Sequence, residues 1–206
     1  ELPGNVRDAV VSVQRALATT GAGVKWVEAD NLHLTMRFLG EITQAQRQTI
    51  ESLLLEVARS RAPIDAALSE VGTFPERGIP RVIWVGIGQG ADQLSRLAEE
   101  IERGLAALSI PNPEKSRSDF QDSVPDMLRM SRGEERRFTA HVTLGRVRAP
   151  RAGEVLRQRL TQIHWTPPAP FRIERITLFQ SMLGSAGPVY TALGRFPLTE
   201  GSAASS

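Results

Sequence analysis

The fold of this 206-residue chain is decided by two short stretches, HLTMRFLG at residues 33–40 and HVTLGR at residues 141–146. Each begins with His-x-Thr, and the two tripeptides contain two of the three histidines in the chain. Side chains at positions i and i+2 of a β-strand point to the same face. We therefore expect each tripeptide to present an imidazole beside a hydroxyl, with Leu34 and Val142 on the opposite, apolar face. An imidazole and a hydroxyl together are suited to handling a phosphate.

The two tripeptides occupy equivalent places in a repeat. Each half of the sequence predicts a helix, a His-x-Thr strand, a second helix and two further strands. From the histidine to the proline before the next strand is 30 residues in the first half and 29 in the second. From the histidine to the start of the last strand is 48 residues in both halves. This predicts an α+β fold: one domain over residues 1–200 whose two lobes, 22–90 and 138–200, face one another across a pseudo-twofold cleft.

Local periodicity predicts the individual elements. Helices are expected at residues 5–20, 44–60, 91–108 and 154–162, with Thr43 as the N-cap of the second. Strands are expected at 32–39, 64–71, 81–87, 171–179 and 189–196, and at the second His-x-Thr stretch. Residues 112–137 carry prolines and charges without sustained periodicity, which predicts a long loop or insertion with one helical turn near 124–130. The tail at 201–206 is predicted to be disordered.

Composition limits the class of protein. The chain is 41% hydrophobic and 23% charged, which is a normal globular balance, and it contains no cysteine. No apolar run approaches the ~20 residues that a membrane-spanning helix needs, and the first residues do not resemble a signal peptide, so we expect a soluble cytoplasmic protein with no membrane partner. The formal net charge is only +2, but residues 112–175 hold 13 Lys and Arg against 8 Asp and Glu. This region is a solvated surface or a place where a polyanion is steered.

Other kinds of site are disfavoured. Transition-metal sites usually gather three or more His, Cys or carboxylate ligands, whereas His-x-Thr supplies one ligand per motif with no acidic partner nearby, so we expect no metal. The stretch GIGQG at 86–90 lacks the spacing and the lysine of a phosphate-binding loop. His164 lies at the end of a predicted helix and is interpreted as structural.

The sequence resembles the 2H phosphoesterases, specifically the LigT-like RNA 2',3'-cyclic phosphodiesterases first named 2'-5' RNA ligases. Residues 33–40 resemble the first signature of this family and residues 141–146 the second. Further similarity lies in TFP at 73–75 with RVIWVG at 81–86, and in the ending from LFQS at 178–181 through GPVY at 187–190 to FPL at 196–198. The resemblance implies a bilobal fold of two antiparallel-sheet lobes with outer helices and a central cleft. Residues 112–137 are longer than the usual connection, and Ala140 stands where proline is common.

The resemblance also implies an activity: hydrolysis of RNA or nucleotide 2',3'-cyclic phosphate ends to 2'-phosphomonoesters, by a monomer without cofactor. In this scheme His33 is the acid that protonates the leaving O3' and His141 is the base that activates water. Thr35 and Thr143 donate hydrogen bonds to the phosphate, and Arg146 contacts it. The same pair working in reverse would form a 2'-5' RNA linkage without ATP.

Several points stay open at the level of sequence. Arg146 has the opposite strand parity to His141, so its assignment requires a bulge or bend after Leu144, for which Gly145 is suitable. Arg37 shares the parity of His33 and is a second candidate for the cleft. Phe74 either stacks on a nucleobase or fills the core. Alternative functions are hydrolysis of small-molecule cyclic phosphates or 2'-5' oligonucleotides, and an RNA-binding module in which the histidines only contact phosphate.

Overall fold

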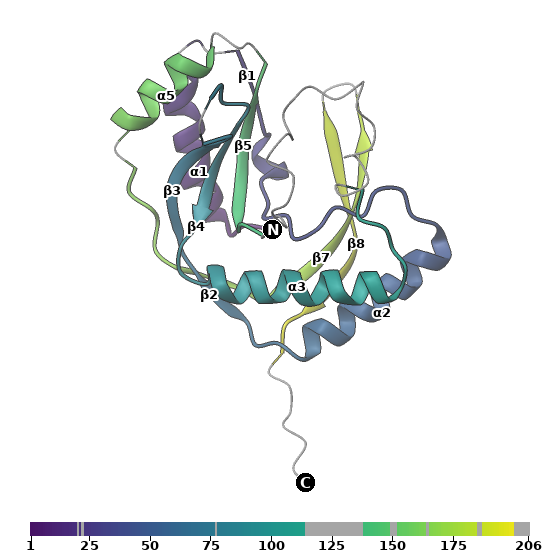
Figure 1. The fold of residues 1–206 in the computed structure, drawn as a ribbon. Coiled ribbons are helices and arrows are strands. Elements are labelled where there is room, and N and C mark those ends of the chain that lie inside the picture. Colours follow the sequence, from purple (N-terminus) through teal and green to yellow (C-terminus); the bar gives the residue numbers. More distant parts are fainter. Residues whose placement is uncertain are drawn as a thin grey trace. The chain divides into compact units, whose positions relative to one another are not determined.

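A computed structural model describes residues 1–19, 21, 23–76, 78–113, 138–148, 152–163, 165–184 and 187–199 (Figure 1). The predicted helical turn at 124–130, most of the predicted loop at 112–137, the tail at 201–206 and His164 lie outside these residues. The described chain forms two compact units. One comprises residues 1–35, 66–91 and 138–171, and the other comprises 36–65, 92–113 and 172–199.

The elements confirm the expected α+β class. The helices are α1 (Gly4–Ala18), α2 (Gln44–Arg59), α3 (Ala91–Ala107) and α5 (Ala152–Gln162), with a 3₁₀ turn η1 (Ala29–Asn31). The strands are β1 (Val24–Trp26), β2 (Ile64–Ala66), β3 (Leu68–Phe74), β4 (Val82–Ile87), β5 (His141–Val147), β6 (Phe171–Ile173), β7 (Arg175–Leu183) and β8 (Pro188–Pro197). Predicted helix bounds agree with the structure to within two residues.

The first unit is built on a four-stranded antiparallel sheet in the order β1-β5-β4-β3. Helix α1 contacts both β5 and α5, and the two helices lie next to one another in Figure 1. The apolar positions of α1 recur at helical spacing and are buried, among them Val6, Val10 and Leu17. Gln14 is also buried, and its amide nitrogen donates to the carbonyl oxygens of Val27 and Leu144 at 2.8 Å. Helix α1 therefore covers one face of the sheet. The side chains of Val142 and Leu144 lie on this covered face and have no exposed surface.

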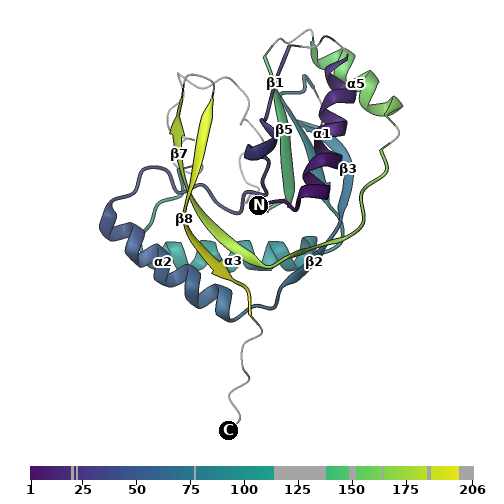
Figure 2. The same cartoon turned by 180° about the vertical axis from the view of Figure 1, so that it is seen from behind.

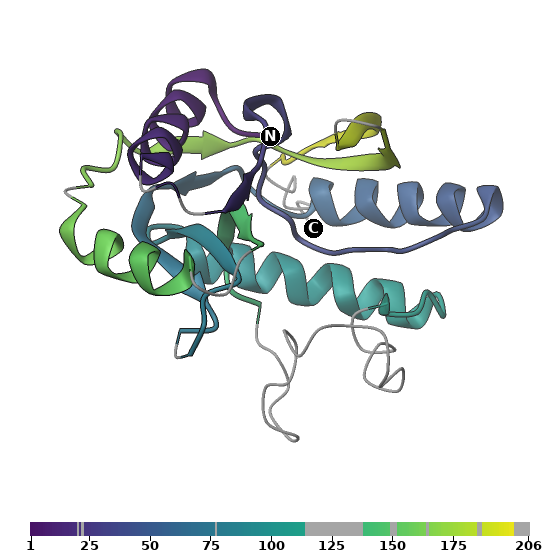
Figure 3. The ribbon, with the colours of Figure 1, turned by 90° about the horizontal axis from the view of Figure 1, so that it is seen from above.

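The second unit contains the long hairpin β7–β8, which packs against α2 (Figure 2). The predicted N-cap of α2 is confirmed: Thr43 Oγ1 accepts from the Gln46 backbone N–H, and the Gln46 side chain accepts from the Thr43 N–H. Helices α2 and α3 lie next to one another in Figure 3, and the Leu53 side chain of α2 packs against Gly104 of α3, where a side chain would not fit. A Cβ there would lie 2.4 Å from Leu53 Cδ1.

Some of the strands differ from expectation, and the strand predicted at 171–179 is one of them, since it is split at Glu174 into β6 and β7. The predicted strand at 32–39 is wrong, since only Leu34 makes a β-bridge, to Val142. By this antiparallel register Met36 would lie opposite Ala140, before β5 begins at His141, so the segment after Thr35 runs past the end of that strand. The same edge of β5 pairs from Gly145 to Val147 with β1, which the sequence did not predict. The strand predicted at 64–71 is interrupted at Ala67, which separates β2 from β3.

The compact units also differ from the expected lobes at 22–90 and 138–200. Each unit collects segments from both halves of the sequence, because β5 of the second half is inserted between β1 and β4 of the first. Among the described helices, none has the length and apolar character needed to cross a membrane.

Candidate active site

The bridge between Leu34 and Val142 brings the two His-x-Thr tripeptides together within the first unit. In an antiparallel pair, the residues that flank a bridged pair oppose one another crosswise. The register therefore sets His33 opposite Thr143 and Thr35 opposite His141. Because Val142 points to the helix-covered face, these four side chains project from the other face of the sheet. This places an imidazole and a hydroxyl twice on one surface, as the sequence predicted.

The two histidine rings are held in the same way. Nδ1 of His33 lies 2.7 Å from the Asn31 carbonyl oxygen, and Nδ1 of His141 lies 2.7 Å from the Thr139 carbonyl oxygen. A carbonyl can only accept, so Nδ1–H is the donor in both rings. In the neutral tautomer Nε2 then carries the lone pair, and in the charged ring Nε2–H is the acidic proton. Each backbone carbonyl thus presets Nε2 as the reactive nitrogen of its histidine.

Burial affects the ionisation of His33. Desolvation lowers the pKa of His33 below its ordinary value, and this effect outweighs the hydrogen bond to the Asn31 carbonyl, which acts to raise it. A lowered pKa increases the neutral fraction of the ring at pH 7. His33 is therefore suited to accept a proton.

Two aromatic side chains surround His141. Trp84 stacks on Phe74 with ring centroids 5.1 Å apart, and the His141 ring meets Phe74 edge-on at 5.3 Å and Trp84 at 6.4 Å. Trp84 is paired with Gly72 on β3, and its ring lies over that glycine. Phe74 is half-buried, so it neither fills the core completely nor presents an open platform. The two rings limit how far the His141 imidazole can move.

The bulge required by Arg146 is present. Thr143 pairs with Trp84, but Gly145 pairs with Ile83, so Leu144 is an extra residue in β5. Leu144 and Gly145 are consecutive buried residues, and the alternation of faces resumes one position later. Arg146 opposes Val82, two residues before Trp84, and it consequently projects from the face that carries His141 and Thr143.

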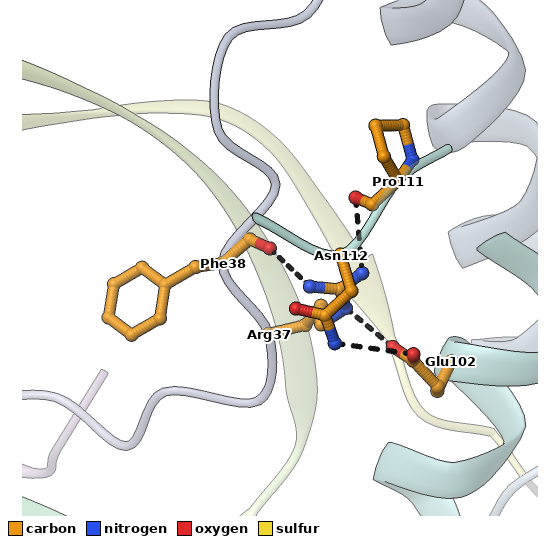
Figure 4. A network of polar contacts seen from close by, with 5 residues as sticks. All are labelled: Arg37, Phe38, Glu102, Pro111 and Asn112. Atoms are coloured by element: carbon orange, nitrogen blue, oxygen red, sulfur yellow. Dashed lines mark hydrogen bonds and ion pairs between the residues drawn. The ribbon is translucent and has the colours of Figure 1, made fainter. Parts of the chain in front are cut away.

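Arg37 belongs instead to a polar network in the second unit (Figure 4). Its Nε lies 2.6 Å from Glu102 Oε2, and its terminal nitrogens donate to the carbonyl oxygens of Phe38 and Pro111. Asn112 donates to the other carboxylate oxygen of Glu102. Arg37 therefore does not share a strand face with His33 as predicted, because the chain at this position is not a strand. The guanidinium is largely buried, with 9% of the side chain exposed. It links α3, through Glu102, to the segment that follows this helix, through the Pro111 carbonyl oxygen.

Comparison with known proteins identifies the family of this chain. The sequence model described as LigT like Phosphoesterase matches residues 1–84 and 117–190. The chain belongs to the LigT-like phosphoesterase family. It is 29% identical to an RNA 2',3'-cyclic phosphodiesterase of Methanothermobacter thermautotrophicus over 96% of this chain and 95% of that protein. It is 32% identical to an RNA 2',3'-cyclic phosphodiesterase of Aeropyrum pernix over 86% of this chain and 88% of that protein.

The fold of this LigT-like phosphoesterase also matches solved structures. The protein TT0787 of Thermus thermophilus superposes with a TM-score of 0.71 and 31% identity over 97% of this chain and 94% of that chain. The sequence did not single out Trp84 for this site. Trp84 lies in the strand motif at 81–86, but only the ring contacts reveal its place beside His141. Within the described residues, no group of three or more His, Cys, Asp or Glu side chains is arranged to hold a metal ion.

Proposed function

We propose that this enzyme hydrolyses 2',3'-cyclic phosphate ends of RNA or nucleotides to 2'-phosphomonoesters by two-histidine acid–base catalysis. The crosswise register of the two His-x-Thr tripeptides carries the proposal, since it supplies two imidazoles and two hydroxyls around one position on the sheet face. The RNA substrate is supported by the relatives, which are named RNA 2',3'-cyclic phosphodiesterases.

In the proposed step, one neutral imidazole takes a proton from water at Nε2 while the water oxygen attacks phosphorus. The bond from phosphorus to O3' breaks, and the second imidazole, protonated at Nε2, gives its proton to O3'. Thr35, Thr143 and Arg146 bind the non-bridging oxygens, where negative charge accumulates. The 2'-phosphate is the product. The first imidazole is left protonated and the second neutral, and proton exchange with solvent restores the starting state.

The lowered pKa of His33 supports an assignment of roles that differs from the one implied by the family resemblance. A base must be neutral before the reaction, and burial favours the neutral form of His33. We therefore assign His33 as the base and His141 as the acid. A 5'-hydroxyl can replace water with the same roles: His33 takes the proton of the 5'-hydroxyl, the bond from phosphorus to O3' breaks, and His141 protonates O3', which leaves a 2'-5' linkage. Hydrolysis dominates because water is in large excess over RNA ends.

The deciding experiment uses a nucleoside 2',3'-cyclic phosphate in the presence of EDTA. We expect turnover by the wild type, and a loss of about 10²- to 10⁴-fold in kcat for His33→Ala and for His141→Ala. His164→Ala is the matched control, because it removes the third histidine and leaves the sequence of both His-x-Thr tripeptides unchanged. This variant should retain full activity. No wild-type turnover, or unchanged rates in both histidine variants, would overturn the proposal. A 3'-phosphate product would contradict the regiochemistry.

A further inference from the structure

Beyond the reacting phosphate, the sheet face continues as a row of exposed cations. Lys25 on β1 is paired with Arg146 on β5, so their side chains share the face that carries the two histidines. Arg148 follows Arg146 by two positions, and its backbone N–H donates to the Gly23 carbonyl, which extends the same pairing beyond β5. Figure 1 shows β1 alongside the end of β5. Lys25, Arg146 and Arg148 are all exposed.

These three cations carry no compensating charge in the part of the chain that the structure describes. Five other arginines there, Arg7, Arg37, Arg47, Arg61 and Arg172, each form an ion pair with a carboxylate. Lys25, Arg146 and Arg148 form none with the described residues. Uncompensated cations on one face attract a polyanion, and their effect is strongest where several lie in a row.

Distances along the strand divide the row into two parts. By register Arg146 lies two ladder positions from Thr143, about 7 Å, so its side chain reaches a phosphate held between the two tripeptides. Arg148 lies two positions further, about 13 Å from Thr143, where its side chain cannot reach the same phosphate. Lys25 lies across the strand from Arg146, on the side away from β4. Arg148 is therefore left for other anionic groups of the substrate. Lys25, at the level of Arg146 and on the edge of β5 that pairs with Leu34, lies between Arg148 and the His-x-Thr tripeptides, where the next phosphate of a bound chain would pass.

We propose that Lys25 and Arg148 bind the backbone phosphates of an RNA chain immediately 5' of the terminal cyclic phosphate. This rests on the proposed function, which places the cyclic phosphate at the His-x-Thr tripeptides. A cyclic phosphate occupies the 3' end of its chain, so every further phosphate lies on the 5' side. The row then makes the enzyme selective for polynucleotide ends over free cyclic nucleotides. It binds phosphate rather than base edges, so the selectivity is independent of sequence.

The test compares two substrates, a nucleoside 2',3'-cyclic phosphate and an RNA octamer that ends in a 2',3'-cyclic phosphate. For the wild type we expect a higher kcat/KM on the octamer. For the double variant Lys25→Ala with Arg148→Ala, we expect the ratio of octamer to mononucleotide kcat/KM to fall on the order of tenfold. The logarithm of kcat/KM on the octamer should also depend less steeply on the logarithm of salt concentration, by about 0.7 per cation removed.

The matched control is Arg15→Ala, which removes one exposed cation from α1, the helix that covers the opposite face of the sheet. It should leave the ratio unchanged, and Lys25→Arg should retain the wild-type ratio because the charge is kept. An equal ratio for wild type and double variant, or an equal loss on both substrates, overturns the inference. Binding of a plain RNA octamer, measured by fluorescence anisotropy, tests the row independently of catalysis. If the wild type does not turn over either substrate but the double variant still loses binding, the proposed function fails and the RNA site stands.

Discussion

Gly72→Ala is expected to displace the Trp84 ring, which contacts the His141 ring. Gly72 lies on β3 opposite Trp84, and a Cβ at this position would lie 2.4, 2.7 and 2.8 Å from three carbons of the indole ring. Carbon atoms in contact prefer separations of about 3.5 to 4.0 Å, so the ring must move by about 1 Å. Trp84 is only 8% exposed and has Phe74 stacked on it, so the displacement is passed to its neighbours.

Two consequences follow from this displacement. Overpacking of this kind costs about 1 to 3 kcal/mol, which outweighs the ~0.4 to 1 kcal/mol that Gly→Ala contributes by restricting the unfolded chain. The indole also contacts the His141 ring, and a misplacement of about 1 Å at a catalytic group can cost on the order of 10²-fold in rate. We expect a lower free energy of unfolding in urea, and a lower kcat on a nucleoside 2',3'-cyclic phosphate.

Gly4→Ala provides the matched control. Gly4 begins α1, and a Cβ there would meet nothing within 4 Å, so the same change should be neutral or stabilise the protein by up to about 1 kcal/mol without altering kcat. If Gly72→Ala has the stability and kcat of the wild type, the added methyl group does not displace Trp84 and the expected overpacking is refuted. If Gly72→Ala destabilises the protein but leaves kcat unchanged, the packing argument holds and the positioning argument fails.

The remaining predictions concern ionisation, helix capping and the Arg37 network. Above pH ~6.5 the His33 ring is neutral in both the folded and the unfolded chain, and as the pH falls the unfolded chain takes up the proton first. The free energy of unfolding of the wild type should therefore decrease relative to that of His33→Gln as the pH falls. Urea titrations at several pH values measure this difference. For the same reason, if His33 is the base, the acid limb of the kcat/KM profile has its midpoint below pH ~6.5, and a midpoint above it would contradict our assignment. Thr43→Ala should lower the free energy of unfolding by about 1 kcal/mol through loss of the capping box, and Thr43→Ser should restore most of it. Glu102→Ala leaves a largely buried guanidinium without its carboxylate and should cost about 3 kcal/mol, whereas no measurable change would show that the Arg37 network adds nothing to stability.

Local sequence signals predicted most elements of the fold. Apolar residues at helical spacing located α1, α2 and α3, and Thr43 marked the start of α2, because capping and amphipathic burial depend on neighbours three or four residues apart. The predicted strand at 32–39 was wrong because strand pairing depends on where the partner strand begins and ends. With Leu34 paired to Val142, the residues after Thr35 run past the start of β5 at His141, and β1 pairs with the other end of β5.

The same division applies to the candidate site. The spacing of residues by itself determined that His33 and Thr35 share a face, as do His141 and Thr143, and it specified that Arg146 needs a bulge beside Gly145. Which imidazole opposes which hydroxyl was decided only by the tertiary register, because residues more than 100 positions apart become neighbours through one β-bridge. The aromatic contacts of His141 and the burial that lowers the pKa of His33 also arise only when distant segments pack together.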